Sequence, residues 1–175
     1  MKLLILLLLV SCAGIQKTIP IKPEFDAESF ELFKSRSNLP WVHELQEAAN
    51  CVIKKESFAH SVREVTGFTY SDKSGVVVYE DLTDSRTCTI STYKTKWYSP
   101  FKYVVMATTW PSDKEKLYLN LRVNPRPMPD MIETVIHECL HLKGYSHGDN
   151  SRIGKENSVN YKVGALAKKN SDGCY

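Results

Sequence analysis

The chain has 175 residues, of which 42% are hydrophobic and 25% are charged, as in an ordinary globular domain. Its 23 basic and 20 acidic residues give a formal net charge of +3, and this near balance argues against a nucleic-acid-binding protein, which usually has a marked basic stripe. The length fits one domain that buries a core of its own.

The first eleven residues have the pattern of a signal peptide. Lys2 supplies a positive charge, and residues 3–10 form an apolar run too short to cross a bilayer. Leu9-Val10-Ser11-Cys12 resembles the lipobox of bacterial lipoproteins, which implies cleavage before Cys12 and attachment of lipid to its thiol. The resemblance predicts an exported lipoprotein, anchored to a bacterial membrane and facing the periplasm or the cell surface. An ordinary signal peptide with an incidental cysteine is the alternative.

Residues 12–23 are expected to form the lipidated N-terminus and a short tether, and residues 24–175 a single domain. Residues 24–35 predict a short helix, and Pro40 begins a stronger one with apolar residues at helical spacing as far as Ile53. The pattern then changes to β-branched and aromatic residues bounded by turn residues. Four strands are expected, at residues 75–81, 87–93, 102–110 and 117–123.

A second strong helix is predicted after Pro127 and Pro129. Asp130 and Glu133 lie in its first turn, where the helix dipole favours acidic side chains. Its apolar residues recur at the spacing of one buried stripe: Met131, Ile132, Val135, Ile136, Cys139 and Leu140. The order of helix, strands and helix indicates an α+β fold.

Three of the five histidines lie between residues 137 and 147. His137 and His141 are four residues apart, so they project from one side of a helix and can share an ion at about 2.0–2.1 Å. Glu138 can hydrogen-bond a water on that ion without being a ligand. Gly144 can turn the chain through a positive φ, so that His147 returns as the third ligand. Three protein ligands with one open position are typical of catalytic zinc.

These residues complete the motif H-E-x-x-H-x-x-G-x-x-H, and the chain therefore resembles the metzincin zinc-dependent endopeptidases. The resemblance implies a twisted mixed sheet of about four strands, with an N-terminal helix, a zinc-binding active-site helix and a C-terminal helix. It also implies one Zn²⁺, a peptide or protein substrate, and Glu138 as the general base. In that family an edge strand near the cleft binds the substrate backbone.

The family's methionine turn follows the third ligand, and this chain departs from it. Its methionines all precede His147: Met1, Met106, Met128 and Met131. Residues 158–161, Ser-Val-Asn-Tyr, are similar to a degenerate form of the Ser-x-Met-x-Tyr turn of some members. That similarity implies Tyr161 as an oxyanion donor, and a tyrosine that simply packs on the C-terminal helix is the alternative.

Residues 140–147 also resemble the H-G-x-L-H-L-x-G-Y-D-H motif of bacterial rRNA-maturation endoribonucleases, which hold zinc with three histidines. Glu138 and Ser146 depart from that motif, which has Gly and Asp there. Because an exported lipoprotein does not meet pre-ribosomal RNA, the N-terminus favours the peptidase. A zinc hydrolase of another bond and a non-catalytic metal-binding lipoprotein stay open as alternatives.

Besides Cys12, four cysteines remain for an oxidising compartment: Cys51, Cys88, Cys139 and Cys174. Two disulfides would allow three connectivities, among which the sequence does not choose, and buried thiols are the alternative. A bridge from Cys139 would hold the metal-binding helix to the rest of the domain.

Overall fold

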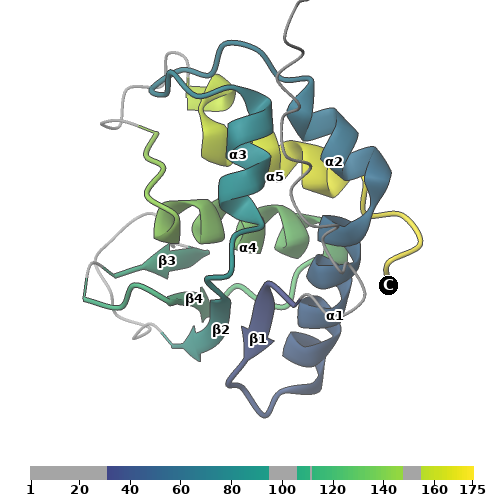
Figure 1. The fold of residues 1–175 in the computed structure, drawn as a ribbon. Helices are drawn as coiled ribbons and strands as arrows, with labels where there is room; N and C mark the ends of the chain where they lie inside the picture. Colours follow the sequence, from purple (N-terminus) through teal and green to yellow (C-terminus); the bar gives the residue numbers. More distant parts are fainter. Residues whose placement is uncertain (1–30, 95–105, 111, 148–154) are drawn as a thin grey trace, which may run out of the picture.

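A computed structural model of the protein describes residues 31–94, 106–110, 112–147 and 155–175, which form an α+β fold with a mixed sheet (Figure 1). In chain order the elements are β1 (Phe33–Ser35), α1 (Pro40–Lys54), α2 (Glu56–Arg63), α3 (Gly75–Leu82), β2 (Cys88–Tyr93), β3 (Ala107–Thr109), β4 (Lys116–Asn120), α4 (Met128–Leu142), the 3-10 helix η1 (Lys155–Asn157) and α5 (Val159–Lys169). The predicted signal peptide and tether, with Cys12, lie outside these ranges. Within them, no helix combines the length and apolarity that crossing a bilayer requires.

The sheet has four strands in the order β1-β2-β4-β3. Strands β1, β2 and β4 run parallel to one another, whereas β3 is antiparallel to β4 and lies at one edge. Helix α4 packs against β2, β4 and β3, and α5 packs on α4 on the side away from the sheet (Figure 1). The mixed α+β architecture predicted from the sequence is therefore present, and α4 is its central helix.

The core forms where the apolar stripe of α4 meets the sheet. All six residues of the predicted stripe are buried. Ile90 of β2 lies opposite Leu117 of β4, and both side chains are fully buried. These two residues and the α4 stripe belong to one buried core cluster, in which each Leu or Ile contributes about 1.5–3 kcal/mol on burial. The prediction of α4 from its periodicity is confirmed, as is that of the helix beginning at Pro40.

The strand predictions succeed in part. Strand β2 matches the prediction at residues 87–93, and β4 matches the first part of residues 117–123. Residues 121–123 form a turn instead, because Asn120 accepts hydrogen bonds from Arg122 N (3.1 Å, at Oδ1) and Val123 N (3.2 Å, at its carbonyl oxygen). Of the strand predicted at residues 102–110, β3 is present, and residues 102–105 lie outside the described part of the chain.

The strand predicted at residues 75–81 is wrong, because this segment forms helix α3. Ser74 is its N-cap and accepts a hydrogen bond from Val77 N at 3.4 Å. Gly75 fits where a Cβ would lie 2.1 Å from the carbonyl oxygen of Val62, so the helix begins in contact with the end of α2. Gly75, Val78 and Leu82 are buried along one helical face. This docking outweighs the β-propensity of the valines.

The helix predicted at residues 24–35 is wrong at its end, since Phe33–Ser35 form β1, and residues 24–30 lie outside the described ranges. Asn50 of α1 accepts from Phe33 N at 2.9 Å and donates to Phe33 O at 3.0 Å. Leu32 O accepts from Cys88 N at 2.8 Å. These bonds to distant residues hold the segment extended, and local periodicity does not report them.

Candidate metal centre

The structure brings the three predicted ligands together. His137 and His141 come from α4, and His147 lies in the turn that follows it. The ring centroids are 5.0 Å apart for His137 and His141, 5.5 Å for His137 and His147, and 4.9 Å for His141 and His147. One ring nitrogen from each lies within 4.8 Å of the other two, so the cluster could hold one metal ion.

The turn that returns His147 is a Schellman motif at the end of α4. Tyr145 N donates to Leu140 O, and Gly144 N donates to His141 O, each at 3.0 Å. Gly144 has φ +95°, the positive value that the sequence predicted. Tyr145 and Leu140 are both buried, as the apolar contact of this motif requires. The turn therefore folds from local bonds and carries His147 back toward the helix.

Replacing Gly144 with alanine is expected to lower the free energy of unfolding by about 1–2 kcal/mol, because a Cβ disfavours positive φ. No atom lies within 4 Å of the added Cβ, so the loss comes from the backbone alone. Urea denaturation measures it. Asparagine tolerates this conformation better, and Gly144→Asn is expected to lose less. Equal stability of the alanine variant and the wild type would contradict this account of the turn.

His141 has a fixed orientation. Its Nδ1 lies 2.8 Å from the backbone carbonyl oxygen of Tyr145. A carbonyl oxygen only accepts hydrogen bonds, so Nδ1 carries the proton and Nε2 keeps its lone pair for a ligand bond. Burial, with smaller contributions from the neighbouring histidines, lowers the pKa of His137 to about 3. Burial also lowers the pKa of His141. Both imidazoles are therefore neutral at pH 7, which is the state that binds metals.

Glu138 follows the first ligand on α4. Burial raises the pKa of its carboxyl group to about 7. A carboxylate with a pKa in this range can accept and release a proton near neutral pH. Tyr93, at the end of β2, is a neighbour that the sequence did not indicate: burial and then the Glu138 charge raise its pKa. This electrostatic influence depends on how β2 packs beside α4.

Tyr161 lies against the cluster from the first turns of α5. Its ring meets that of His137 edge-on at 4.5 Å and lies 5.3 Å from that of His147. Lys155 Nζ lies 4.8 Å from the centroid of the Tyr161 ring. Asn160, which is fully buried, donates from Nδ2 to His137 O at 3.2 Å. Residues 158–161 thus pack on α4 at the first ligand, although they contain no methionine.

Two disulfides join distant parts of the domain. Cys51 of α1 is bonded to Cys174, and Cys88 of β2 is bonded to Cys139 of α4. The structure thus selects one of the three possible connectivities. Cys139 lies between His137 and His141, so its bond attaches the segment of α4 that carries these two histidines to the sheet.

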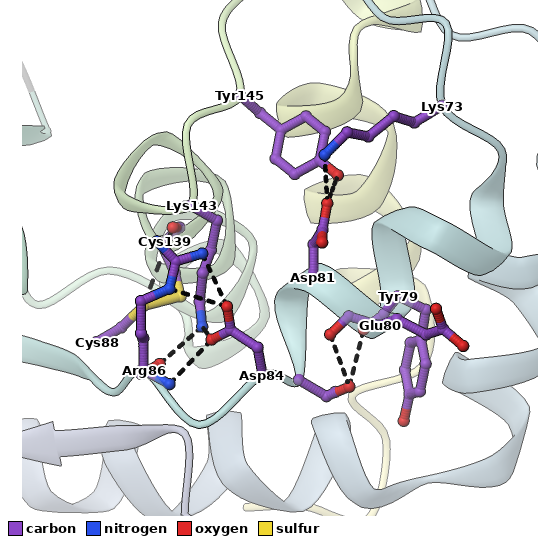
Figure 2. A network of polar contacts seen from close by, with 11 residues as sticks. Lys73, Tyr79, Glu80, Asp81, Asp84, Arg86, Cys88, Cys139, Lys143 and Tyr145 are labelled. Atoms are coloured by element: carbon purple, nitrogen blue, oxygen red, sulfur yellow. Dashed lines mark hydrogen bonds and ion pairs between the residues drawn. A yellow bond between two sulfur atoms is a disulfide. The ribbon is translucent and has the colours of Figure 1, made fainter. Parts of the chain in front are cut away.

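A second attachment lies at the end of α4 (Figure 2). The side chain of Lys143 is 1% exposed, and its ammonium pairs with Asp84 and donates to Arg86 O at 2.7 Å. Burial alone would raise the pKa of Asp84, but hydrogen bonds from Arg86 and Lys143 outweigh it and lower the pKa to about 2. Asp84 and Arg86, in the segment between α3 and β2, therefore hold Lys143, which begins the turn after α4.

Comparison of the chain with protein-family models, with curated proteins and with solved structures finds no match. Among the described residues, the three histidines are the group whose donor atoms converge as metal ligands would. The other two histidines, His43 and His60, are exposed on α1 and α2.

Proposed function

We propose that the protein is a zinc-dependent endopeptidase of metzincin type. The observation that carries the proposal is the convergence of His137, His141 and His147, with Glu138 next to the first of them. Three imidazole ligands suit zinc, and they leave a coordination position for water or substrate. The α+β fold, with the metal-binding helix on a mixed sheet, is compatible with the metzincin architecture.

Zinc bound there would lower the pKa of a water and polarise the scissile carbonyl. Glu138 would take a proton from the attacking water and pass it to the leaving amine, a role that fits its raised pKa. Tyr161 would donate a hydrogen bond to the oxyanion, which its position beside His137 and His147 supports.

The substrate proposed is an extended peptide that adds to the edge of the sheet. Strand β3 (Ala107–Thr109) is the edge strand next to β4 in the described sheet, and it packs against α4. An extended segment beside β3 would gain backbone hydrogen bonds, which are independent of side chains. A peptide bound in this way runs past α4 rather than ending in a closed pocket, as an endopeptidase requires.

The proposed location is outside the cytoplasm, on a bacterial membrane through lipid on Cys12. Two disulfides support export, because such bonds persist in oxidising compartments. The near balance of charge fits a protein substrate better than a nucleic acid.

Metal analysis of the purified protein, paired with digestion of a peptide library and of RNA, tests the proposal. The expected result is one zinc per chain and peptide cleavage that a chelator abolishes. Zinc-dependent cleavage of RNA without peptide cleavage would select the endoribonuclease-like alternative. Bound zinc without either activity would select a metal-binding lipoprotein, and a protein that binds no metal would contradict all three.

A further inference from the structure

We propose that Asp81 is a positioning residue for the metal centre, which it reaches through Tyr145 and His141. The inference rests on the zinc site proposed above. Asp81 belongs to α3, 64 residues before Tyr145. Tyr145 lies between the second and third ligands, and its phenol donates to Asp81 Oδ2 at 2.5 Å (Figure 2). The same residue therefore contacts α3 with its side chain and His141 with its backbone carbonyl oxygen.

The acceptor end of this connection is well defined. Asp81 Oδ2 also accepts from Lys73 Nζ at 2.6 Å. That ammonium lies 5.1 Å from the centroid of the Tyr145 ring. A hydrogen bond from a hydroxyl to an ionised carboxylate is about twice as strong as one between neutral groups. Asp81 thus holds the phenol of Tyr145, Lys73 in turn holds Asp81, and Tyr145 is 7% exposed.

The backbone carbonyl group of Tyr145 orients the ring of His141. The backbone of Tyr145 is fixed by its bond to Leu140 O, and its carbonyl oxygen holds His141 Nδ1 at 2.8 Å. A rotation of the Tyr145 peptide would turn the His141 ring and displace His147, two residues further on. The bond from the phenol to Asp81 opposes such a rotation, because it holds the side chain of Tyr145 in place.

Lys143 and Tyr145 are attached to the same region of the domain, with Gly144 between them. Lys143 pairs with Asp84, and Tyr145 bonds to Asp81 (Figure 2). Groups that hydrogen-bond to a metal-binding histidine, or orient one, change metal affinity by about 10–100-fold when they are removed. Asp81 is one step further from the ion, and it acts on the carbonyl that orients His141.

The test measures zinc affinity, by competition with a chromophoric chelator, and the absorption spectrum of the Co²⁺ form of the full-length protein. Tyr145→Phe removes only the phenol oxygen and is expected to raise the Kd for zinc by about tenfold, the lower end of the range for groups bonded directly to a ligand. Asp81→Ala is expected to have a similar effect. The double variant, Asp81→Ala with Tyr145→Phe, is expected to bind zinc no more weakly than either single variant, because the two residues act as one unit.

Tyr79→Phe is the matched control. Tyr79 also belongs to α3, and its phenol donates to Ile53 O at 3.1 Å, a bond with no connection to the histidines. Its loss is expected to lower Tm slightly and to leave both zinc affinity and the Co²⁺ spectrum unchanged. A Co²⁺ spectrum altered in Tyr145→Phe but not in Tyr79→Phe shows that the ligand geometry has changed and that lost stability is not the cause.

Two results overturn the inference while leaving the zinc site intact. In one, Tyr145→Phe binds zinc within about twofold of the wild type, against the larger change expected for such groups. In the other, Tyr79→Phe weakens zinc binding as much as Tyr145→Phe does. A wild-type protein that binds no zinc would instead overturn the metal centre itself, and with it the positioning role. The thermal melt of each variant shows that it is folded before its Kd is compared.

Discussion

Replacing Glu138 with glutamine is expected to leave one zinc bound per chain and to lower kcat/KM for peptide cleavage by about 10²–10⁴-fold. Glutamine keeps the shape of the side chain but cannot take a proton from water. Burial raises the pKa of Glu138 to about 7, which suits a group that must both accept and return a proton. Zinc content by metal analysis and initial rates on a peptide cleaved by the wild type measure the two effects.

His141→Ala is the control that separates the base from the ligands. It is expected to lose both zinc and activity, because a site with two imidazoles holds zinc weakly. Added zinc should raise the Tm of Glu138→Gln, which keeps its three ligands, and should leave that of His141→Ala unchanged. Peptide cleavage at the wild-type rate by Glu138→Gln would show that another group is the base.

The pH dependence of kcat/KM is a second test of Glu138 as the general base. A general base acts when it is unprotonated, so kcat/KM should rise with pH through the pKa of Glu138 and then level off. A divalent ion beside a carboxylate favours the charged form and lowers its pKa. The pKa of Glu138 without metal is about 7. The acidic limb of the profile of the zinc-loaded wild type is therefore expected at a pH below 7. The residual activity of Glu138→Gln should lack this limb.

Replacing Asp84 with alanine is expected to lower the free energy of unfolding by about 3 kcal/mol. The ammonium of Lys143 is buried, and the variant would leave it with the carbonyl oxygen of Arg86 but without the carboxylate that pairs with it. The expected value is at the lower end for a broken buried pair, since Asp84 is 32% exposed and solvent screens part of the attraction. Urea denaturation at pH 7 measures the loss.

Lys143→Met provides the matched comparison. Methionine fills a similar volume without a charge, so this variant is expected to lose much less stability than Asp84→Ala. The double variant should recover most of what Asp84→Ala loses, because no uncompensated ammonium remains. A double variant as unstable as Asp84→Ala alone would mean that the pair matters through packing and not through charge.

The pH dependence of stability follows from the lowered pKa of Asp84, which is about 2 in the folded protein. The unfolded chain takes up this proton near pH 4, so the contribution of Asp84 is complete above that pH and disappears as the pH falls through about 2. Asp84→Ala should lack this acid-sensitive part. Burial lowers the pKa of Lys143, and without Asp84 it falls further. The variant should therefore regain stability as the pH rises toward 10.

The sequence determines the parts of the site that depend on neighbours along the chain. The four-residue spacing of His137 and His141 and the buried stripe of α4 follow from helical periodicity alone. Gly144 adopts the positive φ that its position after the helix predicted, and the bonds that close its turn span five residues or fewer. The local pattern was therefore sufficient to place His147 near the other two ligands.

The tertiary structure decides what depends on residues that are distant in sequence. Residues 75–82 have the β-propensity of a strand, yet they form α3 because Gly75 packs on the carbonyl oxygen of Val62. The pairing of Cys88 with Cys139 follows from the position of β2 beneath α4. Asp81 reaches Tyr145 only because α3 packs beside the turn after α4. Periodicity reports which face of an element is buried, whereas the partner that buries it is selected by packing across the whole domain.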